Sequence, residues 1–264
     1  MRRSALAVTF LALTGAVHGQ RLANLGGRDQ YPQFRVLSGM SGGGYGVLPN
    51  GAPSIEGAAS FTTPIAFLLD GHAALSFFNT SSDRNPFRFS ERVGVEDANG
   101  TGSFTIGGSY KGWRGAASFV ALSKHLDSAF NLQVAPPIRG RLGVSFGVQD
   151  VAGGGGASGT NVPGDTDSSR SFFGVATYDF GHSVYGSLGV GDRRFHGAFG
   201  NVSAPITRRL RVTAEYDSFT INAGLLYGTG PLRDLGGRLS KTEADLFLGL
   251  IAGKYATLGV TVSL

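Results

Sequence analysis

The sequence has 264 residues, including 43 glycines and no cysteine; 41% of the residues are hydrophobic and 16% are charged. A typical soluble domain is about 25% charged, so this chain is poor in charge, while its hydrophobic content disfavours a disordered protein. The absence of cysteine excludes a disulfide framework, a thiolate metal site and a lipid-modified cysteine anchor.

Residues 1–19 have the three parts of a secretory signal peptide. Arg2 and Arg3 supply the positive start, residues 5–17 form an apolar run, and Gly19 is a small residue before the expected cleavage site. The apolar run is shorter than the ~20 residues that a spanning helix needs. We therefore expect export through the general secretory pathway and cleavage. The mature chain then carries 21 Lys and Arg against 18 Asp and Glu, a balance too mild to indicate nucleic-acid binding.

Residues 20–45 are polar and rich in glycine, and fit either a periplasmic lead-in or a segment inside a barrel. We predict a single barrel domain over residues 46–264. Alternating apolar residues predict its first strand over Ser54–Thr63 and its second over Phe67–Phe78. The polar stretch 80–100 is typical of a long external loop. No stretch after the signal approaches the ~18 apolar residues of a spanning helix.

A hairpin is predicted over residues 104–119, with Lys111-Gly112 as a two-residue turn. Its polar face carries Ser109 and Arg114. Aromatic residues stand at the turn end, where the interfacial girdle of a transmembrane barrel lies. The predicted apolar pairs are Tyr110 with Trp113, Gly108 with Gly115, Ile106 with Ala117 and Phe104 with Phe119.

The middle of the chain continues the strand pattern. Residues 122–131 fit a short helix, although Phe130, Leu132 and Val134 alternate as a strand. Residues 150–170 contain four consecutive glycines without a following Gly-Lys-Ser/Thr, which predicts a surface loop instead of a phosphate-binding loop. Further strands are predicted over Leu142–Gln149, Phe172–Phe180 and Val184–Val190, the last two as a hairpin about Gly181-His182.

The clearest hairpin runs from Leu210 to Tyr227, with a predicted two-residue turn at Asp217-Ser218. Its strands have one apolar face, one polar face and an aromatic rim, which is typical of a transmembrane barrel. The apolar face pairs Tyr216 with Phe219, Ala214 with Ile221, Val212 with Ala223 and Leu210 with Leu225. The polar face pairs Glu215 with Thr220, Thr213 with Asn222 and Arg211 with Gly224.

The chain closes with a hairpin of Ala244–Ala252 and Ala256–Leu264 about a Gly253-Lys254-Tyr255 loop. We therefore predict an all-β protein, an antiparallel up-and-down transmembrane β-barrel of about 12 strands, within a range of 10–14. A secreted β-sandwich is the alternative, with the apolar faces as its core. The polar faces are rich in Gly, Ser, Thr and Asn instead of Lys and Glu, and such small residues suit a barrel lumen.

No catalytic, cofactor or metal site is predicted. The histidines lack metal-ligand spacing, and the adjacent His182 and Ser183 fit a turn better than a catalytic pair. Glu215 and Asp217 fit a polar lumen better than an acid/base pair. The residues expected to face the lumen are Ser109, Arg114, Arg211, Thr213, Glu215, Thr220 and Asn222. The residues expected at the membrane interface are Tyr110, Trp113, Tyr216, Phe219 and Tyr227.

Three stretches resemble the YjbH-type family of outer-membrane barrels associated with exopolysaccharide production. They are Gly46–Ala52, Gly147–Gly153, and Ala214–Asp217 together with Asn222–Gly224. The resemblance implies a non-catalytic outer-membrane barrel that takes part in exopolysaccharide biosynthesis or export. It further implies outer-membrane lipid, polysaccharide and other envelope export proteins as partners. A general porin-like channel is the alternative function, and a soluble binding or structural protein is the third.

Overall fold

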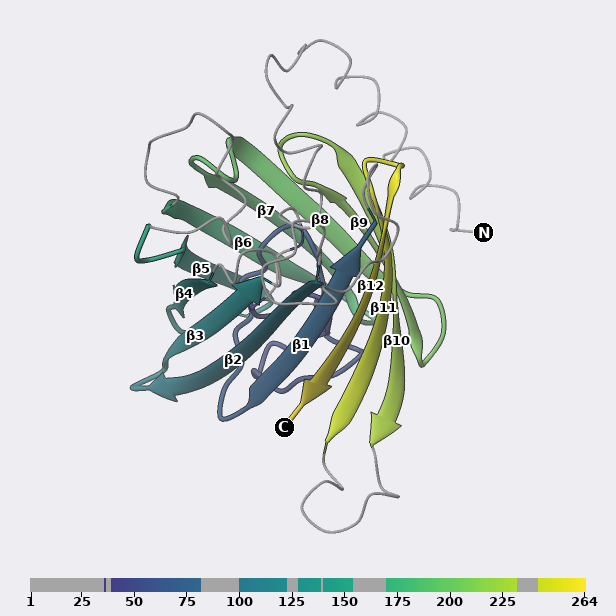
Figure 1. The fold of residues 1–264 in the computed structure, drawn as a ribbon. Helices are drawn as coiled ribbons and strands as arrows, with labels where there is room; N and C mark the ends of the chain where they lie inside the picture. The colour runs from purple at the N-terminus through teal and green to yellow at the C-terminus, as the bar shows by residue number, and fades with distance from the viewer. Residues whose placement is uncertain are drawn as a thin grey trace.

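The computed structural model describes residues 36, 39–81, 100–122, 128–138, 140–153, 170–231 and 242–264. These residues form twelve strands that close into one antiparallel barrel (Figure 1). The strands follow chain order around the barrel, and β1 pairs with both β2 and β12, so no strand edge is left open. The predicted barrel of about 12 strands is confirmed, and the sandwich alternative is wrong. The strands are β1 (Ala73–Thr80), β2 (Gly100–Tyr110), β3 (Trp113–Leu122), β4 (Ser128–Ala135), β5 (Leu142–Gln149), β6 (Ser171–Gly181), β7 (Val184–Gly191), β8 (Gly197–Pro205), β9 (Leu210–Tyr216), β10 (Ile221–Pro231), β11 (Glu243–Ile251) and β12 (Tyr255–Ser263).

The outer face of the barrel is apolar and the inner face is polar. On β1, Leu75 and Phe77 are exposed while Ser76 between them is buried. The same inversion on β12 exposes Leu258 and Val260 and buries Thr257 and Thr261 on the inner side. A soluble protein has the opposite arrangement, whereas a barrel that faces lipid needs an apolar outer surface. The outer surface therefore fits an outer-membrane location. In the part of the chain that the structure describes, no helix has the length and hydropathy to cross a membrane.

The two ends of the barrel differ. One end carries the two-residue turns Lys111-Gly112 and His182-Ser183, the longer β10–β11 connection and the C-terminal end of β12 (Figure 1). The connections β1–β2 and β5–β6, which are long, leave from the other end. In outer-membrane barrels the short turns face the periplasm and the long loops face outward. The end with the two-residue turns is called the short-turn end below.

Residues 39–71, here called the inner segment, run through the interior of the barrel before β1 begins (Figure 1). The segment has no regular strand; it contains isolated bridges between Gly43 and Ser60, and between Val47 and both Pro53 and Ala58. It fills the lumen between opposite strands.

Apolar clusters lock the inner segment against the barrel wall. Phe61 packs on Phe247 of β11 at a ring-centroid distance of 4.8 Å, and Phe67 meets Tyr185 of β7 edge-on at 5.9 Å. Both phenylalanines of the inner segment are fully buried. Aromatic pairs of this kind contribute about 0.5–1.5 kcal/mol each beyond their buried area. The lumen thus contains a packed core.

The predicted strand over Ser54–Thr63 is wrong, and the strand predicted over Phe67–Phe78 begins only at Ala73. Period-2 alternation shows that a chain is extended, but not that it pairs with a neighbour. Ile55 and Phe61 alternate because they contact apolar wall residues inside the barrel. Residues 39–45, which fit two settings from sequence, lie inside the barrel.

Two of the three predicted hairpin registers need a correction. The β2–β3 register agrees in all four predicted pairs. In the β9–β10 hairpin the turn has four residues, 217–220, so Tyr216 pairs with Ile221. The Asp217 carboxylate accepts the amides of Phe219 and Thr220 at 3.2 and 2.9 Å, which stabilises the longer turn.

The closing hairpin shows the same kind of shift. Its loop is residues 252–254, and Ile251 pairs with Tyr255. Both errors shift the register by two residues, and an even shift preserves the face of every side chain. The open choice for residues 122–131 is settled for 128–131, which belong to β4.

Candidate functional site: the occupied lumen

Glu215 of β9 accepts hydrogen bonds from the backbone of the inner segment. Its Oε1 accepts the Phe61 amide at 2.7 Å, and its Oε2 accepts the amides of Thr62 and Thr63 at 2.8 and 3.0 Å. The hydroxyls of Thr62 and Thr63 also donate to Oε2, at 2.7 and 3.1 Å. Three consecutive amides form a concave site for an anion, and the wall supplies that anion as a buried carboxylate.

Arg211 lies four residues before Glu215 on the same inward face of β9 and binds the opposite kind of group. Its Nε donates to the Ile55 carbonyl and its Nη2 to the Glu56 carbonyl, each at 2.8 Å. Nη1 donates to Ser203 Oγ at 3.0 Å. The guanidinium also stands 5.5 Å from the Tyr185 ring centroid. One strand therefore holds the carbonyls of residues 55–56 and the amides of residues 61–63.

Other inward side chains continue this pattern around the wall. Gln133 of β4 donates to the Ile65 carbonyl at 2.7 Å, and Thr177 of β6 accepts the Ala66 amide at 2.7 Å. These bonds satisfy buried backbone groups that regular strand pairing would otherwise satisfy. Asn201 of β8 donates to Thr63 Oγ1 at 2.8 Å, and Asn222 of β10 donates to Thr62 Oγ1 at 3.1 Å.

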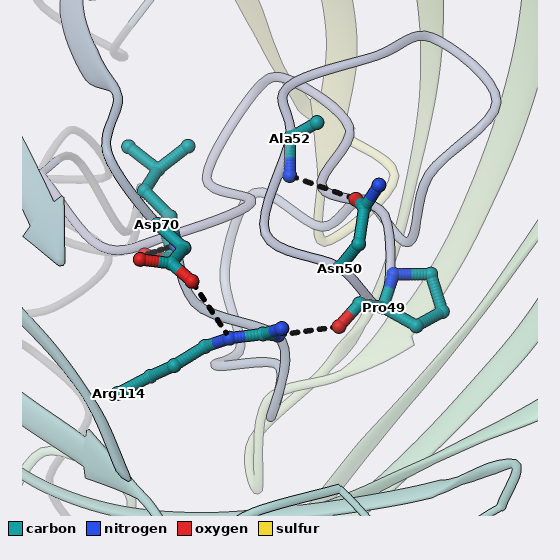
Figure 2. A network of polar contacts seen from close by, with 7 residues as sticks. Pro49, Asn50, Ala52, Asp70 and Arg114 are labelled. Atoms are coloured by element: carbon teal, nitrogen blue, oxygen red, sulfur yellow. Dashed lines mark hydrogen bonds and ion pairs between the residues drawn. The ribbon is translucent and has the colours of Figure 1, made fainter. Parts of the chain in front are cut away.

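Arg114 binds the inner segment close to the short-turn end. Figure 2 shows its guanidinium between the Asp70 carboxylate and the Pro49 carbonyl. Its Nε lies 3.5 Å from Asp70 Oδ2, and both side chains are partly exposed. An ion pair in this setting contributes at most about 1 kcal/mol. The contact marks where the segment leaves the lumen for β1.

Glycines in the wall let the inner segment approach closely. A Cβ at Gly107 of β2 would lie 2.1 Å from the Leu69 carbonyl oxygen, and one at Gly143 of β5 would lie 2.6 Å from the Phe67 ring. Both distances are shorter than any normal contact. Part of the high glycine content therefore reflects space for the inner segment.

The residues expected to face the lumen fall into two groups. Arg211, Thr213, Glu215 and Asn222 point inward and are at most 3% exposed. Arg114 is partly buried. The other two lie at barrel ends: Thr220 belongs to the β9–β10 turn and is partly exposed, while Ser109 is exposed beside the β2–β3 turn.

The residues expected at the membrane interface also fall into two groups, one at each end of the barrel. Tyr110 and Trp113 are 74% and 55% exposed and flank the β2–β3 turn, and Tyr227 is exposed on the outer face of β10. Tyr216 and Phe219 lie at the opposite end and are partly buried. Phe219 belongs to the β9–β10 turn, where its ring stacks on His196 at 5.6 Å.

Sequence reasoning missed the partners of the wall within the inner segment. Thr62, Thr63 and Ala66 carry no motif, and their polar contacts join residues more than 100 positions apart in the chain. One local signal was present. Pro53 and Pro64 border the predicted strand over Ser54–Thr63, and proline is disfavoured in paired strands.

The described residues offer little for catalysis. His182 and Ser183 both have positive φ and form the β6–β7 turn. Glu215 binds the inner segment and Asp217 caps a turn, so the two carboxylates have separate tasks. Within the described ranges, no three His, Asp or Glu residues lie close enough together to hold a metal ion.

Comparison with known proteins finds no family model and no curated protein that matches the chain. Among solved structures, "KdgM porin in complex with disordered oligogalacturonate" has a TM-score of 0.43 and 9% identity, covering 73% of this chain and 97% of that chain. A second structure, "KdgM porin", has a TM-score of 0.43 and 8% identity, covering 72% and 97%. Similarity at this level transfers no substrate.

Proposed function

We propose that the protein is a non-catalytic outer-membrane barrel that works as a porin-like channel, closed in this state by the inner segment. The observation that carries the proposal is how the segment is attached. Polar wall side chains such as Arg211 and Glu215 hold it. In the described residues, its backbone bonds to the backbone of the wall strands only beside β1, where Gly71 donates to Gly107. The segment can therefore leave without breaking the sheet.

The polar inner wall supports the same proposal. Thr213, Glu215 and Asn222 are hydrogen-bonding groups that water can satisfy once the segment has moved. Twelve strands enclose a lumen between the filled 8-stranded and the wide 16-stranded barrels, which suits a narrow solute path.

A polysaccharide is the second, finer part of the proposal. Two of the three stretches that resemble the YjbH-type family belong to the contact between wall and inner segment. Gly46–Ala52 contains the Pro49 carbonyl that binds Arg114, and Ala214–Asp217 contains Glu215. This overlap supports a role in exopolysaccharide biosynthesis or export. The proposed signal peptide at residues 1–19, outside the described residues, would direct the chain to the envelope through the general secretory pathway.

Single-channel recording in planar bilayers tests the channel. The wild-type protein is expected to be mostly closed with rare openings. The double variant Arg211→Lys/Glu215→Gln is expected to open frequently, because the hydrogen bonds from both β9 side chains to the inner segment are weakened. The matched control, Arg209→Lys, changes an exposed side chain and should record like wild type. Silent recordings from every variant, or a wild type that conducts steadily, would overturn the gated channel. Unchanged polysaccharide secretion in a deletion strain would remove the second part alone.

A further inference from the structure

Asp245 of β11 is a buried carboxylate with one oxygen that makes no hydrogen bond. It points into the barrel and is 2% exposed, and its Oδ1 makes no hydrogen bond. A buried carboxylate that lacks a partner costs several kcal/mol unless a proton or a cation neutralises it. By contrast, the buried carboxylate of Glu215 in the lumen accepts five hydrogen bonds.

Along β11 and toward β12, the neighbours of Asp245 are oxygen groups. Glu243 lies two residues earlier on the same inward face, and Ser263 of β12 stands directly opposite Glu243 in the sheet. Directly opposed residues have Cβ atoms about 4.5–5.5 Å apart, and diagonal neighbours are about 7 Å apart. Ser263 is 2% exposed, and its Oγ also lacks a hydrogen-bond partner.

The inner segment covers this group of oxygens. Gly44 accepts a hydrogen bond from Thr261, the residue opposite Asp245, at 3.5 Å. The next residue, Tyr45, is 1% exposed and belongs to the same buried cluster as Ala74, which pairs with Ser263. Its hydroxyl makes no hydrogen bond of normal geometry. Burial raises the pKa of the Tyr45 hydroxyl, and the charge of Asp245 raises it further. The phenol therefore stays protonated.

We propose that Asp245, Glu243, Ser263 and Tyr45 form a cation site that joins β11 and β12 to the inner segment, and that its ligand is Ca²⁺. All four groups are oxygen donors, which hard cations prefer over transition metals. Ca²⁺ accepts irregular sets of six to eight oxygens, with water completing the set, whereas Mg²⁺ demands a strict octahedron. Glu243 is partly exposed near the short-turn end and gives the ion a way in.

The composition of the site sets its expected strength. Two carboxylates supply the formal charge, fewer than in high-affinity calcium sites, so the dissociation constant should be on the order of 0.1–1 mM. This inference is independent of the channel proposal, since Ca²⁺ can fasten the inner segment in a closed barrel that never conducts.

The test uses the purified full chain in detergent free of lipopolysaccharide, with Ca²⁺ alone as the probe. The unfolding temperature is measured by the loss of heat-modifiable gel mobility, in EDTA and across a Ca²⁺ titration. Ca²⁺ should raise the wild-type unfolding temperature, and Asp245→Asn should need at least about tenfold more Ca²⁺ for the same rise. Asp192→Asn, at an exposed carboxylate on the opposite end of the barrel, is the control and should respond like wild type.

A second readout follows the ion itself. Tb³⁺ replaces Ca²⁺ in oxygen sites and emits when a nearby phenol is excited. Emission should appear with wild type, fall on adding Ca²⁺, and be lost in Tyr45→Phe. Asp245→Asn keeps the shape of the side chain and removes the buried charge, so it should fold as well as wild type in EDTA. Equal Ca²⁺ response of wild type and Asp245→Asn, or no Ca²⁺ response at all, would overturn the site.

Discussion

Glu215 and Thr62 are joined by two hydrogen bonds, because both the amide and the hydroxyl of Thr62 donate to the same carboxylate oxygen, at 2.8 and 2.7 Å. The two residues lie 153 positions apart in the chain. One belongs to the wall and the other to the segment that fills the lumen. A charged acceptor on the wall thus replaces the sheet partner that the extended inner segment lacks.

Replacement of Glu215 by glutamine is expected to destabilise the folded barrel by about 2–4 kcal/mol. The carboxamide keeps the size of the side chain but places an NH₂ group against amide donors, which leaves buried donors unpaired. Urea unfolding in lipid vesicles measures the change. Arg209→Lys, on an exposed side chain, should stay within about 0.5 kcal/mol of wild type. A wild-type midpoint for Glu215→Gln would show that the carboxylate does not hold the segment.

Arg211 and Glu215 are expected to act together although they are about 13 Å apart along β9. Both bind the same stretch of inner segment, so losing either one frees part of it. Their combined effect on stability should therefore differ from the sum of the single effects by at least 0.5 kcal/mol, on the order seen for residues that share a partner. A double-mutant cycle with Arg211→Lys and Glu215→Gln measures this coupling. Strict additivity would mean that each end is held independently.

The same two variants should expose the inner segment to labelling. The chain has no cysteine, so Ala66→Cys provides a single thiol at a site that is 1% exposed. A membrane-impermeant maleimide should react slowly with this thiol in the wild-type background. It should react several-fold faster when Arg211→Lys and Glu215→Gln are added, because the segment leaves the lumen more often. The same slow rate in both backgrounds would contradict a displaceable segment.

The wall could be predicted from sequence because lipid and lumen act on alternate residues. Tyr110 and Trp113 mark the β2–β3 turn. The alternation of outward and inward side chains from Trp113 to Phe119 then sets the register. Longer turns are harder to predict. The β9–β10 turn has four residues because Asp217 binds two amides beyond it, and Ser218 adopts a φ of 72°.

The inner segment could not be predicted in the same way. Phe61 and Phe67 are apolar for the same reason as any core residue, and an extended chain alternates whether or not it pairs. What distinguishes the segment is its contact with Glu215, Gln133 and Thr177, each on a strand distant in sequence. Such contacts depend on the closed barrel and leave no local pattern. The lumen-facing position of Glu215 was expected from alternation, but its partners were not.

Close approach of the inner segment to β2 makes a matched pair of glycine variants informative. A Cβ at Gly107 would lie 2.1 Å from the Leu69 carbonyl oxygen, whereas a Cβ at the neighbouring Gly108 meets nothing within 4 Å. Gly107→Ala should therefore destabilise the barrel by about 1–3 kcal/mol through overpacking. Gly108→Ala should be neutral or slightly stabilising, because alanine restricts the unfolded chain. Equal effects of the two changes would place the inner segment elsewhere.

The single tryptophan allows the outer face to be located in the bilayer. Trp113 is 55% exposed beside the β2–β3 turn, where it should sit at the level of the lipid headgroups. Its fluorescence should be quenched more by lipids brominated near the headgroup than by lipids brominated near the chain ends. Phe104 points outward on β2, about 15 Å deeper after allowance for strand tilt. In Trp113→Phe/Phe104→Trp the depth preference should reverse. Quenching that is equal for both lipids at both positions would show that this face does not contact the bilayer.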